Sequence, residues 1–430
     1  MESQYQSIRP QLVARNFNGA NTFLDSTKES FYSEKNRLLF YMDKGVVLQL
    51  AGRYKESNEF LEKAKQAAED LWTESFSQHA VALIGNDNAL AYQGEDFEHV
   101  LIHLLASLNY LAMDQWEDAQ VEARQVTERL DQINRKYEGE ARSVYADDAF
   151  SRWLAGRMRA IAGTHEALND AWIDYRRALE VYDGAYRQFY GTRIPTLVLQ
   201  DAILALRKLG ASFADQLQDV TERYGDGGLP KEGFSDDYGE VMLIHQNGEA
   251  PFKVDDYWFA NTPHGPLRIA FPRFVKKFPR IVGSRIVRIA DKSVHVSELL
   301  EDVSSIAVRN LQDHMARIKT KAIARAVAKH VAGAIAQEVG RNQKNSTGGA
   351  VTQLVGLAWN IGNAVAEEAD KRSWLTLPSE VRVARLFLPT GVHALELEFY
   401  TETGDVLVRL PVSVEVTPGK TSFLLYRTFL

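Results

Sequence analysis

The sequence predicts a mainly α-helical protein with a smaller β part, and three patterns support this fold class. Apolar residues recur at three- and four-residue spacing from Phe97 to Leu111, as on the buried face of a helix. Small residues recur in the first half of the chain, where two antiparallel helices would cross. Short alternating runs separated by Pro and Gly follow residue 380, which is typical of an antiparallel sheet.

The first half of the chain is expected to form helical hairpins. One helix, broken at Gly19-Ala20, is expected from about Tyr5 to Ser30. Three sets of residues then resemble a tetratricopeptide repeat: Gly45, Leu48, Gly52, Tyr54, Ser57, Leu61 and Ala64, then Ser107, Trp116, Ala119, Ala123 and Val126, and finally Ala171, Tyr175 and Ala178. The distances between these sets do not fit the regular repeat of about 34 residues, so we expect an irregular tetratricopeptide-like α-solenoid.

The composition changes near Tyr224, where a loop rich in Gly, Asp and Pro begins. Strand-like runs follow at residues 240–245, 267–271 and 284–290, then an Ala-rich basic helix, then an uncharged run at residues 345–366. Turns at residues 389–391, 403–405 and 418–420 should join the last strands as hairpins. We expect four parts: a solenoid at 1–225, a Pro-rich mixed region with short strands at 226–295, an Ala/Gly-rich helical hairpin at 296–371, and an antiparallel β module at 372–430.

The composition excludes several classes of function. The net charge of −7 argues against a general nucleic-acid-binding protein. The absence of cysteine excludes disulfides, a thiolate metal site and a cysteine nucleophile. The first residues, MESQYQSIRPQLV, contain no apolar signal core, so we expect either a cytoplasmic protein or a chain that follows a removed leader.

Three stretches resemble a family of uncharacterised bacterial envelope proteins with tetratricopeptide-like repeats. These stretches are DKGVVLQLAGRYKES, NDNALAYQGEDFEHVLIHLLASLNYLAMDQWEDAQVEAR and RSWLTLPSEVRVARLFLPTG, of which GEDFE and RSWLTLP are the more specific parts. The resemblance implies a lipoprotein of the periplasm and outer membrane, anchored by an N-terminal lipidated cysteine that this chain lacks. It also implies that the protein accompanies relatives of the curli-secretion pore lipoprotein and of the lipoprotein activators of penicillin-binding proteins. It implies no catalytic residue.

One helix face carries residues with metal-ligand chemistry. Asp96, His99 and His103 fall at spacings of three and four, so they share a face, and two histidines four apart can hold a metal ion. The zinc-hydrolase motif requires an inner glutamate, which is missing, and no third ligand is evident. We therefore favour polar contacts for these residues and keep a metal site as a weaker alternative.

The same helix begins with three carboxylates, Glu95, Asp96 and Glu98. The helix dipole favours negative charge in a first turn, so a structural role is favoured over paired-carboxylate catalysis. Asn86, Asp87 and Asn88 are expected to cap this helix rather than bind a ligand. The sequence contains neither a phosphate-binding Gly-rich loop nor a nucleophile elbow, so we expect no catalytic residue and no cofactor.

Three functional hypotheses follow. The first is a non-enzymatic scaffold of a bacterial envelope assembly that binds a protein partner through the solenoid, with oligomer formation left open. Its partner-binding residues are expected to be Tyr92, Glu95, His99, His103, Tyr110 and Trp116. The second is a metal- or carboxylate-dependent enzyme that uses the helix from Glu95 to His103. The third is a membrane-inserting or oligomerising protein that uses residues 331–366. The uncharged run 345–366 within this range nearly matches the length of a bilayer span, but its polar residues favour burial in protein.

Overall fold

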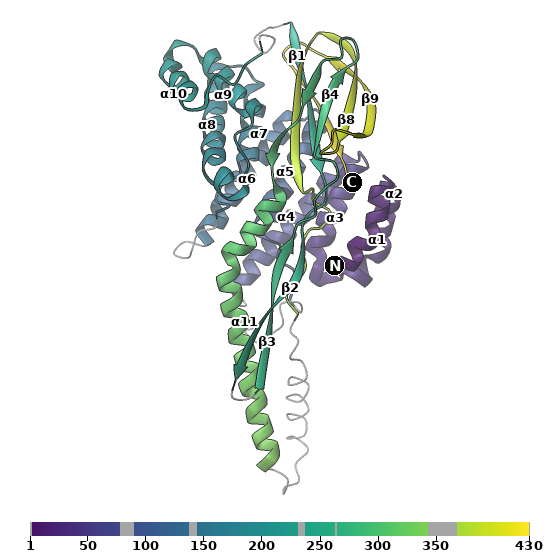
Figure 1. Ribbon diagram of the computed structural model, residues 1–430, viewed down its shortest axis with the longest axis vertical. Helices are drawn as coiled ribbons and strands as arrows, with labels where there is room; N and C mark the ends of the chain where they lie inside the picture. The colour runs from purple at the N-terminus through teal and green to yellow at the C-terminus, as the bar shows by residue number, and fades with distance from the viewer. Residues whose placement is uncertain are drawn as a thin grey trace.

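The computed structural model describes residues 2–77, 90–136, 144–230, 237–262, 265–342 and 368–429. Helices fill the first half and two four-stranded sheets occupy the second, so the expected mainly helical protein with a smaller β part is confirmed (Figure 1). One hydrophobic core joins the helices to the first sheet, and a second core joins the two sheets. The main body therefore consists of a helical layer, a middle sheet and an outer sheet.

The helical layer is a series in which each helix packs against the next one along the chain. Its helices are α1 (Glu2–Val13), α2 (Phe17–Thr27), α3 (Arg37–Leu50), α4 (Tyr54–Ser77), α5 (Asp96–Ala112), α6 (Trp116–Lys136), α7 (Ala149–Ala160), α8 (His165–Val181), α9 (Thr196–Leu209) and α10 (Ala214–Tyr224). The expected break at Gly19-Ala20 is wrong. It lies at residues 14–16, because the Asn16 side chain caps α2 by accepting a hydrogen bond from Gly19 N at 3.1 Å.

Small residues at the helix crossings confirm the expected hairpins. The Ser57 hydroxyl on α4 donates to the Gly45 carbonyl on α3 at 2.6 Å, and the Ser107 hydroxyl on α5 donates to the Ala119 carbonyl on α6 at 3.0 Å. A Cβ atom added to Gly156 on α7 would lie 2.6 Å from the buried ring of Tyr175 on α8. These pairs approach closely because one side of each crossing has almost no side chain.

The strands form a sandwich whose two sheets draw on distant parts of the chain. The middle sheet has the order β10-β1-β7-β6 and the outer sheet the order β5-β4-β8-β9. The strands are β1 (Tyr238–Asn247), β4 (Gly283–Arg288), β5 (Val294–Val296), β6 (Glu298–Glu301), β7 (Glu380–Pro389), β8 (Gly391–Tyr400), β9 (Val406–Val416) and β10 (Thr421–Arg427). Strand β1 pairs antiparallel with β7 and parallel with β10, and the other neighbours pair antiparallel.

This pairing crosses the boundaries expected at residues 295 and 372. Strands from 226–295 and from 372–430 share both sheets, so neither range forms a sheet of its own. Of the three expected hairpin turns, the one near Gly404 joins paired strands, β8 and β9. The other two carry the chain from one sheet to the other, because β7 and β10 belong to the middle sheet whereas β8 and β9 belong to the outer one.

A projecting arm extends away from the three layers (Figure 1). It consists of the two-stranded ribbon β2 (Phe252–Thr262) and β3 (Gly265–Val275) together with helix α11 (Val303–Asn342). Ile269 and Phe271 of β3 pack against Ala322 of α11. Prolines 266 and 272 fit within β3 because its outer edge in a two-stranded ribbon has no ladder partner.

The expected helical hairpin at 296–371 is only partly visible. Strand β6 and helix α11 occupy residues 298–301 and 303–342, and residues 343–367, with most of the expected membrane-contact run, lie outside the described part of the chain. The expected cap at residues 86–88 also lies outside it. In the part that is described, no helix combines the length and the apolar character needed to cross a bilayer.

We expect Gly156→Ala to lower the free energy of unfolding by about 1–3 kcal/mol, because the added methyl group overpacks the α7–α8 crossing. Gly184→Ala is the matched control, since nothing lies within 4 Å of its added Cβ. Urea denaturation of both variants measures the difference. Equal midpoints for Gly156→Ala and the unmodified protein would contradict the close approach.

Candidate functional site: the first turn of α5

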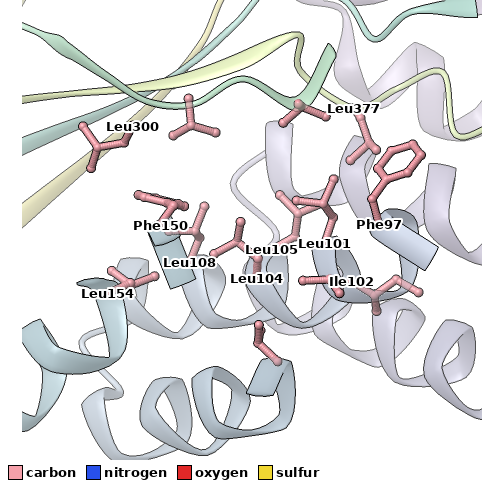
Figure 2. Close-up of a cluster of buried hydrophobic side chains, with 14 of the residues drawn as sticks. Phe97, Leu101, Ile102, Leu104, Leu105, Leu108, Phe150, Leu154, Leu300 and Leu377 are labelled. Atoms are coloured by element: carbon pink, nitrogen blue, oxygen red, sulfur yellow. The ribbon is translucent and has the colours of Figure 1, made fainter. Parts of the chain in front are cut away.

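Helix α5 lies at the centre of the molecule and is buried on almost every side. Figure 2 shows its apolar side chains between α7 residues Phe150 and Leu154, Leu300 of β6, and Leu377. Its start is fixed by a capping box, in which the side chains of Glu95 and Glu98 each accept a hydrogen bond from the backbone of the other. A helix so enclosed can anchor several other segments at once.

The first two residues of this turn contact the arm. Glu95 forms an ion pair with Lys253 of β2, whose side chain is almost fully buried. Asp96 lies 3.5 Å from the imidazole Nε2 of His314 on α11. Because Lys253 and His314 belong to different arm segments, the first turn of α5 lies against both the ribbon and the helix of the arm.

The next two residues complete the set, and we call residues 95–98 the socket. The Phe97 ring packs edge-on against Phe274 of β3, with ring centroids 6.5 Å apart. Glu98 accepts a hydrogen bond from the backbone N–H of Trp374 at 2.6 Å. Trp374 belongs to a segment without regular secondary structure, residues 369–379, that we call the strap. Four consecutive residues therefore contact β2, α11, β3 and the strap, respectively.

The strap is attached to the helical layer by a second buried carboxylate. The Thr376 hydroxyl donates to Asp43 of α3 at 2.7 Å, and the Tyr32 hydroxyl donates to the other oxygen of Asp43 at 2.8 Å. At Glu98 the corresponding tyrosine is Tyr92, whose hydroxyl donates at 2.6 Å. Both carboxylates thus accept one hydrogen bond from a tyrosine and one from the strap.

Burial shifts the titration of these two carboxyl groups. Desolvation raises the pKa of Glu98 to about 7, with repulsion from Glu95 adding to it. Desolvation likewise raises the pKa of Asp43 to about 6, although hydrogen bonds from Thr376 and Tyr32 lower it in part. Each group therefore holds its proton to a higher pH than an ordinary carboxyl group does.

The two histidines of the expected metal site are engaged in separate contacts. The His99 Nε2–H donates to the Gln93 carbonyl at 2.7 Å, and its Nδ1 accepts from the Arg129 guanidinium. The His103 Nδ1–H donates to Glu122 at 3.0 Å, and burial lowers the pKa of His103. Among the described residues, no group of three or more potential ligands is placed to hold a metal ion.

The six expected partner-binding residues fall into two groups. Tyr92, Glu95, His99 and His103 lie at or beside the first turns of α5. Tyr110 and Trp116 lie at the opposite end, near the turn to α6, where the Trp116 ring packs against Phe423 of β10 with centroids 5.3 Å apart. The six residues therefore do not form one surface.

His99 and His103 do line an open groove of about 240 Å³ between α4, α5 and α6. The remaining lining is mostly polar and consists of Glu62, Lys65, Gln66, Ala68, Glu69, Ile102, Gln125, Glu128, Arg129 and Gln132. Lys65 bonds to Glu122, and Arg129 bonds to Glu69 across the groove. We call this surface the α4–α6 groove.

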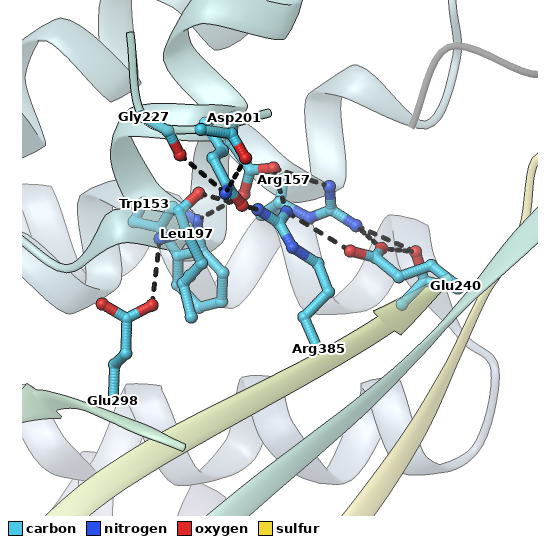
Figure 3. A network of polar contacts seen from close by, with 11 residues as sticks. Trp153, Arg157, Leu197, Asp201, Gly227, Glu240, Glu298 and Arg385 are labelled. Atoms are coloured by element: carbon cyan, nitrogen blue, oxygen red, sulfur yellow. Dashed lines mark hydrogen bonds and ion pairs between the residues drawn. The ribbon is translucent and has the colours of Figure 1, made fainter. Parts of the chain in front are cut away.

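The sequence did not reveal a second polar cluster, where the helical layer meets the middle sheet (Figure 3). Asp201 of α9 accepts from Arg157 of α7 at 3.3 Å and from Trp153 at 2.8 Å, and it also pairs with Arg385 of β7. Glu240 of β1 pairs with both arginines. Burial raises the pKa of Asp201, but attraction to the two arginines outweighs this and leaves the pKa below its usual value.

Two cavities, of about 640 and 380 Å³, flank this cluster and share Tyr238 and Phe387 in their walls. The cluster has two positive and two negative side chains, so its charges balance. Its members join α7 and α9 to β1 and β7, which makes it a junction between layers. One sign of this cluster is visible in the sequence, which is the glutamate Glu240 at the start of the apolar strand run 240–245.

Comparisons with known proteins found no match to a family model, to a curated protein or to a solved structure.

We expect Glu98→Gln to change the pH dependence of stability. A folded-state pKa near 7, against about 4.5 when unfolded, means that the folded chain binds more protons between these values, so stability falls as pH rises through this window. Across this window the free energy of unfolding should fall by on the order of 3 kcal/mol in total. The glutamine variant, which has no carboxyl group to titrate at this position, should not show this fall. Unfolding free energies measured from pH 4 to pH 8 test this, and identical slopes for both proteins would contradict it.

We expect Asp201→Ala to destabilise the protein by about 3–5 kcal/mol, because it leaves the side chains of Arg157 and Arg385, which are 13% and 6% exposed, beside Glu240 alone. Asp183→Ala is the control, since Asp183 pairs with two exposed arginines and its loss should cost less than about 1 kcal/mol. Chemical denaturation gives both values. A small effect at Asp201 would show that the junction contributes little to holding the layers together.

Proposed function

We propose that this protein is a non-enzymatic scaffold of a bacterial cell-envelope assembly that binds a protein or peptide partner through its helical layer. The α4–α6 groove is the observation that carries this proposal. It is open, it is lined by side chains from three successive helices, and it contains two of the residues expected to bind a partner, His99 and His103.

The chemistry of the groove suits an extended peptide. Gln66, Gln125 and Gln132 line it, and each amide can donate to a peptide carbonyl and accept from a peptide N–H. Glu128 adds exposed negative charge, which favours a partner with basic residues, whereas Glu62 is already paired with Lys65 at 2.9 Å.

The fold of the helical layer fits this role. Its helix pairs α3–α4, α5–α6, α7–α8 and α9–α10 follow one another as an irregular tetratricopeptide-like solenoid would, and such stacks present extended grooves. The periplasmic and outer-membrane location, and outer-membrane lipoproteins as partners, rest on the sequence resemblance. GEDFE and RSWLTLP, its more specific parts, meet at the socket through Glu98 and Trp374.

A metal- or carboxylate-dependent enzyme on residues 95–103 has less support. Glu98 has the raised pKa that a general acid would need. Both of its oxygens, however, already accept hydrogen bonds from Tyr92, Glu95 and Trp374 inside the core. A substrate would have to displace the strap to reach this carboxyl group.

We expect the double variant Gln66→Lys/Glu128→Lys to lose its partner, because it adds three positive charges to the groove without removing a core contact. Gln218→Lys/Asp219→Lys makes the same charge change on exposed positions of α10 and should bind normally. The measurement is cross-linking and pull-down from envelope extract, followed by mass spectrometry.

Recovery of envelope lipoproteins by the unmodified protein and the α10 variant, but not by the groove variant, is the expected result. Equal recovery by both variants would show that the partner binds a surface other than the α4–α6 groove. Recovery of cytoplasmic proteins alone would contradict the envelope assignment.

A further inference from the structure

Three consecutive aromatic residues on the arm are exposed. Tyr257, Trp258 and Phe259 of β2 have exposed fractions of 41%, 46% and 67%. The Arg268 guanidinium lies 3.8 Å from the centre of the Tyr257 ring, so a positive charge accompanies them. Side chains of this size are costly in water, and all three belong to β2, a strand of the projecting arm (Figure 1).

The three side chains stand on both faces of the ribbon. Tyr257 and Phe259 lie opposite Ala270 and Arg268 on one face, whereas Trp258 lies opposite Ile269 on the other. A protein partner that covered one face would leave an aromatic residue exposed on the other. Helix α11 covers part of the face that carries Ile269 and Trp258. All three aromatic side chains remain at least 41% exposed beside it, so a medium that fills the space around this end of the ribbon would cover all three.

The arm is basic although the chain as a whole is acidic. Helix α11 contains seven Lys or Arg residues against two Asp or Glu residues, whereas the whole chain has 50 against 57. The two strands of the ribbon contain three Lys or Arg residues and two aspartates, Asp255 and Asp256. The summed charge gives this end of the molecule a positive potential, which complements an anionic surface.

We propose that the arm binds the headgroup region of an anionic lipid surface, with Tyr257, Trp258 and Phe259 entering the interface. Tyrosine and tryptophan favour this region because one part of each ring system is apolar and another donates a hydrogen bond. Basic residues on α11 add attraction to anionic headgroups. This binding is independent of the α4–α6 groove, so either can hold without the other.

The test is co-sedimentation of the full chain with vesicles of phosphatidylglycerol mixed with phosphatidylcholine, and with vesicles of phosphatidylcholine alone. We expect binding to the mixed vesicles that weakens as salt is added. Trp258→Ser/Phe259→Ser should weaken it by about a hundredfold, because each of the two buried aromatic rings contributes roughly a factor of ten. Phe278→Ser/Val392→Ser is the matched control, since both residues are highly exposed but lie outside the arm.

A second measurement does not depend on removing the aromatic surface. Brominated lipids should quench part of the tryptophan fluorescence of the unmodified protein, and Trp258→Phe should lose that quenched part while still binding. Unchanged vesicle binding by Trp258→Ser/Phe259→Ser would overturn the proposal. So would equal binding to neutral vesicles, or binding to RNA or to a protein in the absence of any vesicle binding.

Discussion

The rest of the structure depends on one buried carboxyl group, that of Glu98. Its two oxygens accept hydrogen bonds from the N–H groups of Glu95 and Trp374 and from the Tyr92 hydroxyl, in a site closed to bulk water. These bonds start helix α5, hold the strap and complete the socket. Removal of the carboxyl group would leave several buried donors unsatisfied at the point where three parts of the chain meet.

The sequence predicted the local features and not the long-range ones. The spacing of Gly45 and Ser57 identified a helical hairpin, because the contact it encodes spans only two neighbouring helices. Glu95 and Glu98 were correctly interpreted as helix-start residues, since a capping box is local. Their partners Lys253 and Trp374 lie more than 150 residues away, and no periodicity in a single sequence indicates such a pair.

The β region illustrates the same limit. Alternation identified the strands near Val241 and Val383, but the pairing of β1 with both β7 and β10 depends on which faces are buried. Val241 faces the outer sheet and Met242 the helices, so both faces of β1 are apolar. A strand buried on both faces belongs to a sheet that is covered on both sides, here by the helices and by the outer sheet, and alternation along one strand does not indicate these neighbours.

The socket also connects the two proposed binding surfaces. His99, which lines the α4–α6 groove, directly follows Glu98 in the chain. Glu95, which pairs with Lys253 of the arm, lies one helical turn before His99. The arm is thus fixed to the same helix that forms a wall of the groove, by bonds that are buried and short-range. A partner in the groove would therefore be held at a defined position relative to whatever the arm contacts, which is the property that a scaffold requires.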